Sequence, residues 1–140
     1  MSARKDKKSC TAIVLSAGQG KRMGTKIQKQ YIELEGKPIV CYALETFQKS
    51  SLIDRIILVV GQGQEEYCQK EIVEKYQLSK VTDIVEGGSE RFHSVQNGLK
   101  KVGKDEYVFI HDGARPFVTE EMLERVYAAV CEYPALSLIH

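Results

Sequence analysis

Residues 11–24 of the chain read TAIVLSAGQGKRMG. The first six residues form a short, nearly unbroken apolar run, which is typical of a strand that is buried on both faces of a parallel sheet. A glycine-rich turn follows, and it carries Lys21 and Arg22. Because glycine has no Cβ, main-chain N–H groups in such a turn can approach a phosphate closely, and basic side chains add charge-assisted hydrogen bonds. The stretch therefore predicts a strand that leads into an anion-binding turn.

Three further apolar runs have the same character as the first one. They span residues 53–60, 81–85 and 107–111. Segments with helical periodicity separate them, and this alternation predicts an α/β fold. We expect a Rossmann-like three-layer sandwich with a mainly parallel sheet. Residues 135–139 read as the beginning of a fifth strand, so we expect the sheet to be truncated after the fourth or fifth strand.

The helical segments carry start signals and apolar faces. Pro38 can occupy the first turn of one helix, and Ser89 and Thr119 can cap two others. The residues expected on the buried faces are Ile39, Tyr42, Ala43, Thr46 and Phe47 in the first helix, Cys68, Ile72 and Tyr76 in the second, Phe92, Val95 and Leu99 in the third, and Met122, Val126 and Val130 in the fourth.

Composition sets the class of protein. A chain of 140 residues with 43% hydrophobic residues and a net charge of +1 is expected to fold as one domain, with no global charge that favours nucleic acid. We expect residues 1–10 to form a flexible basic tail and residues 11–140 a nucleotide-binding domain that is incomplete at its C-terminus. No apolar stretch of membrane-spanning length, signal region or CxxC pair is present. A cytoplasmic location is therefore predicted, or the plastid stroma for a plant protein, although no transit peptide is seen.

Two better-known nucleotide motifs do not fit the glycine-rich turn. A dinucleotide fingerprint needs a third glycine where Met23 stands, and an acid after the second strand. A Walker A loop needs Gly-Lys-Ser/Thr at its end, and this turn instead ends in Met23, Gly24 and Thr25. A tight turn with exposed basic residues is an alternative that the glycines alone leave open. Lys29 lies only a few residues further on and can fold back over phosphates bound by the same turn.

Three blocks of sequence carry a family resemblance. The first is SAGQGKRMG at residues 16–24, followed by KQY at 29–31 and GKPI at 36–39. The second is GGSERFHSV at 87–95, and the third is HDGARP at 111–116. In this order the blocks resemble the signature of sugar-phosphate nucleotidyltransferases, and most closely that of the 2-C-methyl-D-erythritol 4-phosphate cytidylyltransferases of non-mevalonate isoprenoid biosynthesis. The resemblance extends over residues 11–130.

The resemblance implies an activity and a set of site residues. A member of the family transfers CMP from CTP to a polyol phosphate, releases pyrophosphate, and uses Mg²⁺ or another divalent cation. Full-length members are expected to be homodimers. The resemblance implies catalytic roles for Arg22 and Lys29, contacts to the nucleotide from Ala17, Gly18, Gly20, Gly87, Arg91, Ser94, Ala114 and Arg115, and a metal-binding role for Asp112.

Several residues also have simpler interpretations. Arg91 could pair with Glu86 or Glu90 on the surface, and Asp112 could belong to a plain turn. Ser94 is by default a serine on a helix face, and His93 and His111 are expected to be structural rather than catalytic. At the level of function, the alternatives are a ribitol-5-phosphate cytidylyltransferase and a non-catalytic nucleotide-binding fragment. Because the family's second half, which holds the substrate phosphate, would lie beyond His140, this chain is expected to be inactive by itself.

Overall fold

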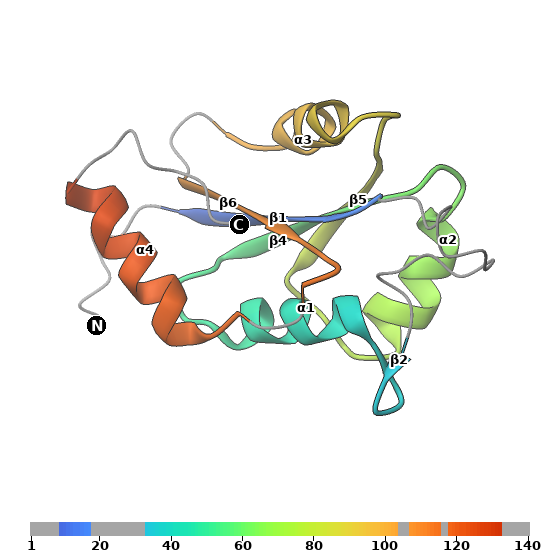
Figure 1. Cartoon of the computed structure of the whole chain (residues 1–140), viewed down its shortest axis with the longest axis horizontal. Coiled ribbons are helices and arrows are strands. Elements are labelled where there is room, and N and C mark those ends of the chain that lie inside the picture. The colour runs from blue at the N-terminus through green and yellow to red at the C-terminus, as the bar shows by residue number, and fades with distance from the viewer. Residues whose placement is uncertain (1–8, 18–32, 104–106, 116–117, 133–140) are drawn as a thin grey trace.

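A computed structural model describes residues 9–17, 33–103, 107–115 and 118–132. For residues 130–132 it describes the backbone alone. Within this part of the chain a sheet of four strands has the order β5-β4-β1-β6. The strands are β1 (Cys10–Ser16), β4 (Arg55–Val60), β5 (Val81–Glu86) and β6 (Tyr107–Asp112). Every pair of neighbours is parallel, so the predicted mainly parallel sheet is confirmed (Figure 1).

The central strands are buried because helices cover both of their faces. All seven residues of β1 and five of the six in β4 are buried, which is why both strands are almost continuously apolar. The edge strand β5 is only half-buried. The predicted strands differ from the observed ones by one or two residues at their ends, and β1 already begins at Cys10. The predicted fifth strand, residues 135–139, lies outside the described residues.

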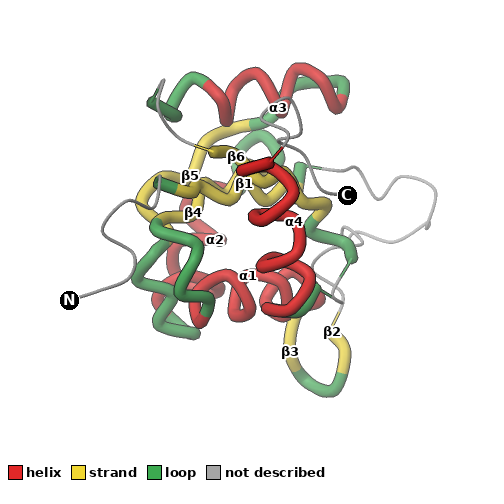
Figure 2. Tube along the Cα trace, turned by 90° about the vertical axis from the view of Figure 1, so that its left-hand side faces the viewer, coloured by secondary structure: helices red, strands yellow, loops and turns green. Residues whose placement is uncertain are grey.

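Helices form the two outer layers (Figures 1 and 2). On one face lie α1 (Ile39–Lys49), α2 (Glu65–Cys68) with the π-helical segment η3 (Gln69–Glu74) that continues it, and α4 (Glu120–Glu132). On the other face lies α3 (Arg91–Leu99). The described residues thus form the predicted three-layer α/β sandwich. None of the described helices combines the length and the apolar character that crossing a membrane requires.

A separate hydrophobic core lies on each side of the sheet. The larger core, on the side of α1, contains the fully buried Phe47 and Phe109 and extends to Ile72 of η3. The smaller core, under α3, is built around Ile13 and Ile57. The side chains of β1 alternate between the two cores, as the pleat of a strand requires.

The predicted buried face of α3 is correct only for Val95, which is half-buried against the smaller core. Phe92 is 59% exposed and Leu99 41% exposed, whereas Ser94 and Gly98 are buried. A Cβ on Gly98 would lie 2.9 Å from Cγ2 of Ile13, so the helix lies close to the sheet and its small residues face inward. Periodicity favours large apolar residues for a buried face, and here close packing requires small ones.

The helix starts are confirmed in one case out of three. The Thr119 hydroxyl accepts the main-chain N–H of Met122 at 3.1 Å, as expected of an N-cap. The N-cap of α3 is Glu90 and not Ser89, and it makes no side-chain capping bond. Pro38 ends a short strand and precedes the first turn of α1 instead of occupying it.

The buried faces of α1 and α4 are rotated from the predicted ones. In α1, Ala43 and Phe47 are buried as expected, but Ile39, Tyr42 and Thr46 are only half-buried, and Val40, Cys41 and Leu44 are buried in their place. In α4, Leu123 is fully buried and Met122 is 43% exposed, Val126 packs half-buried against the larger core as expected, and the side chain of Val130 lies outside the described part. In both helices neighbouring apolar residues were available for the inward positions, and the packing against the sheet selects them.

A small hairpin that the sequence did not predict precedes α1. Its strands are β2 (Glu33–Leu34) and β3 (Lys37–Pro38), and the two residues between them, Glu35 and Gly36, have φ angles of 55° and 82°. Positive φ at both central residues is the mark of a type I′ turn, which explains the glycine.

Candidate active site

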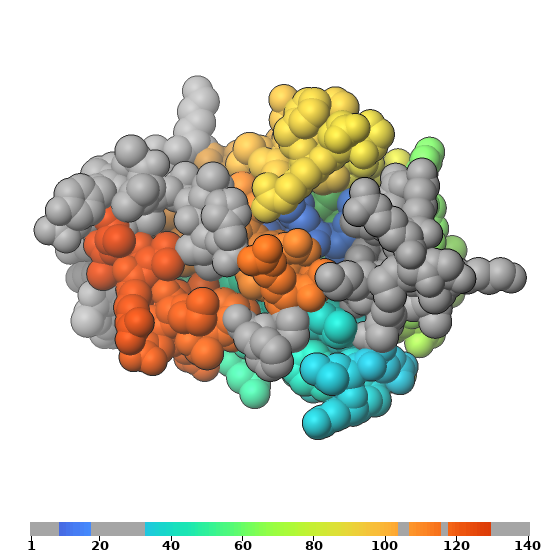
Figure 3. Space-filling view, in the orientation of Figure 1, coloured from blue at the N-terminus to red at the C-terminus, as the bar shows by residue number. Residues whose placement is uncertain are grey.

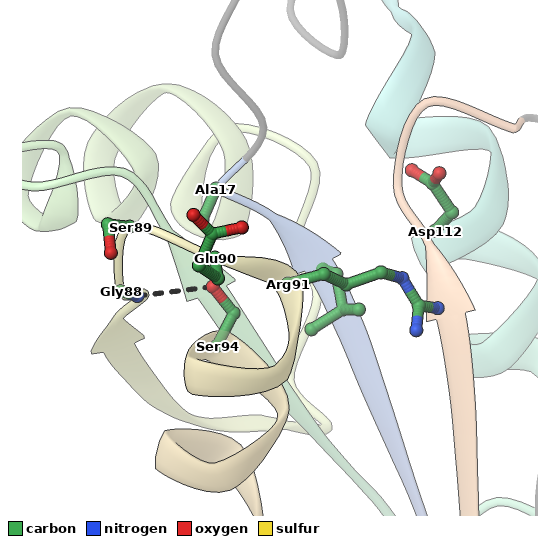
Figure 4. Close-up of a pocket in the computed structure, with 8 residues that line it drawn as sticks. Ala17, Gly88, Ser89, Glu90, Arg91, Ser94 and Asp112 are labelled. Atoms are coloured by element: carbon green, nitrogen blue, oxygen red, sulfur yellow. Dashed lines mark hydrogen bonds between the residues drawn. The ribbon is translucent and has the colours of Figure 1, made fainter.

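A pocket of about 200 Å³ opens at the carboxyl ends of the strands. The ends of β1, β4, β5 and β6 lie level, because Leu15 pairs with Asp112, Ser16 with Val60, and Val60 with Glu86. The order of the strands reverses at β1, which has β4 on one side and β6 on the other. Ligands of open α/β sheets bind at such a reversal. The pocket is lined by Leu15, Ala17, Gly88, Ser89, Glu90, Arg91, Ser94 and Asp112 (Figure 4).

The surface of the molecule shows the same arrangement. In the space-filling view the end of β1 (blue) is visible between α3 (yellow) and the segment that follows β6 (orange) (Figure 3). The pocket is therefore built by three segments that are far apart in the sequence. These segments correspond to the three blocks that carry the family resemblance.

One wall of the pocket is the Gly87–Gly88 turn between β5 and α3. The Gly87 N–H donates to the Val60 carbonyl at 2.7 Å, and the Gly88 N–H donates to Oγ of Ser94 at 3.2 Å. A Cβ on Gly87 would lie 2.4 Å from Oγ of Ser94 and 2.5 Å from Cβ of Ala17. Gly87 is thus the residue that lets the end of β1 and the start of α3 approach each other. The predicted site residues Ala17, Gly87 and Ser94 are brought together here.

Replacing Gly87 with alanine is expected to lower the free energy of unfolding by about 1–3 kcal/mol, because the added methyl group has no space between Ala17 and Ser94. Urea denaturation checks this, with the exposed Ser89→Ala in the same turn as the control. Equal stabilities of the two variants would show that the turn shifts freely and that the close approach is unimportant.

Arg91 begins α3 and brings a positive charge to the pocket. Its side chain is exposed and extends across the end of β1 toward β6, where Asp112 stands (Figure 4). The described ion pairs do not join it to Glu86 or Glu90. Glu86 instead accepts the Gly63 N–H at 3.2 Å. Arg91 therefore remains available for an anion in the pocket.

Asp112 ends β6, where it both stabilises the following turn and lines the pocket. Its Oδ1 accepts the Ala114 N–H at 3.0 Å, and its main-chain carbonyl accepts the Arg115 N–H at 3.0 Å. Asp112 is therefore a turn residue, as the simpler interpretation held, but its side chain also lines the pocket. Ala114 and the exposed Arg115 lie in this turn, beside Asp112, and do not line the pocket itself.

The carboxylate of Asp112 suits a metal ion that takes its other ligands from a bound phosphate and water. No group of three or more His, Cys, Asp or Glu residues that could hold a metal is found among the described residues. Mg²⁺ is commonly held by one or two carboxylates together with substrate phosphates. The second oxygen of Asp112, Oδ2, forms no hydrogen bond with the described residues, which leaves it available for such an ion.

The two histidines of the blocks have structural contacts. His111 is 3% exposed, and its ring lies edge-on to Phe47 with 5.7 Å between ring centroids. Burial lowers the pKa of His111, and the hydrogen bond to the Arg115 carbonyl opposes this only in part, so the imidazole is neutral at pH 7. The ring of His93 packs against the ring of Phe92, with 4.1 Å between the ring centroids. These contacts are those expected of structural residues.

Part of the predicted site lies outside the described residues. This applies to Gly18 and Gly20 of the turn and to both predicted catalytic residues, Arg22 and Lys29. Their roles remain predictions. Conversely, Leu15, Gly88, Ser89 and Glu90 line the pocket but were not predicted. Three of these four stand between Gly87 and Arg91, so their place inside the second block was the available signal.

Comparisons with known proteins agree with the geometry. The family model described as 2-C-methyl-D-erythritol 4-phosphate cytidylyltransferase matches residues 10–139. A protein of that name from Alkaliphilus metalliredigens is 54% identical over 116 residues, which are 82% of this chain and 48% of the relative. Another from Clostridium beijerinckii is 48% identical over 125 residues, covering 89% of this chain and 55% of the relative. The chain spans about half the length of these relatives.

Solved structures show the same likeness. The crystal structure of 4-diphosphocytidyl-2C-methyl-D-erythritol synthase from Anaerococcus prevotii superposes with a TM-score of 0.73 at 32% identity, covering 93% of this chain and 54% of the other. The structure of the 2-C-methyl-D-erythritol 4-phosphate cytidylyltransferase of Francisella tularensis superposes with a TM-score of 0.67 at 28% identity, covering 88% of this chain and 52% of the other. By sequence and by structure, the chain belongs to the 2-C-methyl-D-erythritol 4-phosphate cytidylyltransferase family.

Proposed function

We propose that the chain is the nucleotide-binding part of a cytidylyltransferase that transfers CMP from CTP to 2-C-methyl-D-erythritol 4-phosphate and releases pyrophosphate. The observation that carries the proposal is the pocket at the reversal of strand order, where the described parts of all three sequence blocks meet. The names of the relatives supply the substrates.

The two sides of the pocket suit different parts of CTP. The Gly87–Gly88 turn lies close to Ser94 and Arg91, and we assign the cytosine and its ribose to this side. The triphosphate would lie toward Asp112, near the turn predicted at residues 18–29. Because the described pocket contains two carboxylates, Glu90 and Asp112, against one guanidinium, a polyanion needs further cations there. Arg22, Lys29 and Arg115 are the proposed sources, together with a divalent ion.

The reaction requires positioning more than proton transfer. The nucleophile is an oxygen of a phosphate monoester, which is already anionic at pH 7. It attacks the α-phosphorus of CTP in line, the new P–O bond forms as the bond to the β-phosphate oxygen breaks, and pyrophosphate leaves. No general base is needed, which agrees with the buried His111. Mg²⁺, when bound, neutralises phosphate charge. The chain's own part is to orient the nucleotide and to stabilise developing charge through Arg22 and Lys29.

Replacing Asp112 with asparagine is expected to weaken Mg²⁺-dependent CTP binding about tenfold or more, because a charge-assisted contact is worth roughly 1.5–3 kcal/mol. Asparagine has a similar shape and its Oδ1 can still accept the Ala114 N–H, so the fold should persist. Calorimetric titration with CTP at several Mg²⁺ concentrations measures the effect, and Asp83→Asn, at the opposite edge of the sheet, is the control. Unchanged affinity and Mg²⁺ dependence would make Asp112 a turn residue only.

The substrate is tested by pyrophosphate release from CTP in the presence of each polyol phosphate. We expect release with 2-C-methyl-D-erythritol 4-phosphate from a version of the chain extended to the length of its relatives. Release with ribitol 5-phosphate alone would replace the proposed substrate. CTP binding without release under either condition would indicate a non-catalytic nucleotide-binding module. Homodimer formation by the extended protein and a cytoplasmic location remain predictions from the sequence.

A further inference from the structure

His111 lies on the opposite face of the sheet from the pocket. Successive residues of a strand point to opposite faces. Asp112 lines the pocket on the α3 side, and the preceding His111 lies against Phe47 of α1 in the other layer. The proposed function assigns no role to this buried polar residue.

The imidazole of His111 forms a hydrogen bond, which joins β6 to the turn that follows it. Nε2 of His111 lies 2.7 Å from the main-chain carbonyl oxygen of Arg115. Because a carbonyl can only accept, Nε2 must be the protonated nitrogen and His111 the donor. Nδ1 has no hydrogen-bond partner among the described residues. At 3% exposure, the bond to Arg115 is therefore the polar contact that compensates for burial of the ring.

This bond closes a turn that is already tied from the other side. The Gly113 N–H donates to the Leu15 carbonyl at 2.7 Å, which joins the turn to the end of β1. The N–H groups of Ala114 and Arg115 both donate to Asp112. His111 adds a bond from the residue before the turn to its last residue, so the turn is held on both faces of the sheet.

We propose that His111 is a positioning residue that holds the 112–115 turn in the conformation in which Asp112 presents its carboxylate to the pocket before any ligand binds. Fixing a charged group in advance lowers the cost of ordering it on binding. The proposal rests on the proposed function for the identity of the ligand, but the effect on the turn is a property of the ligand-free protein.

Three substitutions separate the hydrogen bond from simple packing. The side-chain amide nitrogen of glutamine can reach the place of Nε2, so His111→Gln keeps the donor. Asparagine is shorter and its nitrogen takes the place of Nδ1, so His111→Asn remains polar but loses the bond to Arg115. His111→Leu fills space against Phe47 and offers no donor. If one of the two variants without the donor does not fold, the other still provides the comparison with glutamine.

Amide hydrogen exchange in the ligand-free chain is the first measurement. In the asparagine and leucine variants we expect the amides of Ala114 and Arg115 to exchange about three- to tenfold faster, relative to reference amides of Ile57 and Leu58 in β4, since a single hydrogen bond makes a modest net contribution to local stability. The glutamine variant should restore protection. A residue that only packs would change the turn and reference amides by the same factor, and that result would overturn the proposal.

Calorimetry with CTP and Mg²⁺ is the second measurement. The variants without the donor should bind CTP about three- to tenfold more weakly with Mg²⁺ and nearly normally without it, and the glutamine variant should be close to the unchanged chain. Equal Mg²⁺ dependence in all four proteins would contradict the link to Asp112. Failure of the unchanged chain to bind CTP at all would count against the proposed function, while the exchange experiment would still decide whether His111 holds the turn.

Discussion

Replacing Lys29 with alanine is expected to lower kcat by about 10²–10³ and to change KM little, because a charge-assisted contact that strengthens in the transition state is worth roughly 3–4 kcal/mol in a dehydrated site. The α-phosphate gains charge as the nucleophile arrives and pyrophosphate leaves. The described pocket offers only Arg91 as a positive charge. We therefore expect Arg22 and Lys29, together with Arg115 and a divalent ion, to supply the rest of the neutralisation.

The measurement is steady-state pyrophosphate release by a version of the chain extended to the length of its relatives. Lys26→Ala is the matched control, because Lys26 lies in the same segment but outside the family blocks. A Lys29 variant with normal kcat and raised KM would show that the lysine binds the ground state of CTP and the transition state equally well. The same comparison applies to Arg22.

Replacing Phe47 with alanine is expected to lower the free energy of unfolding by about 3–5 kcal/mol, the range found for large aromatic side chains deleted from cores. Phe47 has no exposed surface and belongs to the larger hydrophobic core, where it also contacts the ring of His111. The cavity would open beneath the strand that carries Asp112. Urea denaturation of the variant measures the loss.

Phe92→Ala is the control for this experiment. Phe92 is the same residue type but is 59% exposed on α3, so its removal is expected to change stability by about 0.5 kcal/mol or less. If the two variants lost the same amount of stability, the assignment of the Phe47 side chain to the larger core and of the Phe92 side chain to the surface would be wrong. Sequence periodicity alone predicted both phenylalanines to be buried, so the pair also tests where periodicity fails.

The strands could be predicted from the sequence because burial on both faces leaves a simple signature. Residues 12–15 and 56–60 are apolar without interruption, and Ile13 and Ile57 within them are fully buried. The helix faces were harder to predict. The inward side of α3 is set by Ser94 and Gly98, which face the sheet because the helix lies close to it, and hydrophobicity does not reveal this.

The site was predicted to a similar extent. Ala17, Ser94 and Asp112 come from three distant blocks, and they line one pocket because the strands that precede them end at the same level. The hydrogen bonds that hold the turn after β6 in place could not be predicted from the sequence. The bond from His111 to the Arg115 carbonyl depends on a turn geometry that the letters HDGARP do not specify.

The central claim is that the pocket at the ends of β1, β5 and β6 binds CTP, with the base recognised by the Gly87–Gly88 side. Calorimetric titration of the chain with CTP and with ATP, both in the presence of Mg²⁺, tests it most directly. We expect clearly tighter binding of CTP, because the family to which the chain belongs and the relatives that it matches are named for transfer of a cytidylyl group. Equal affinities for the two nucleotides would contradict the account.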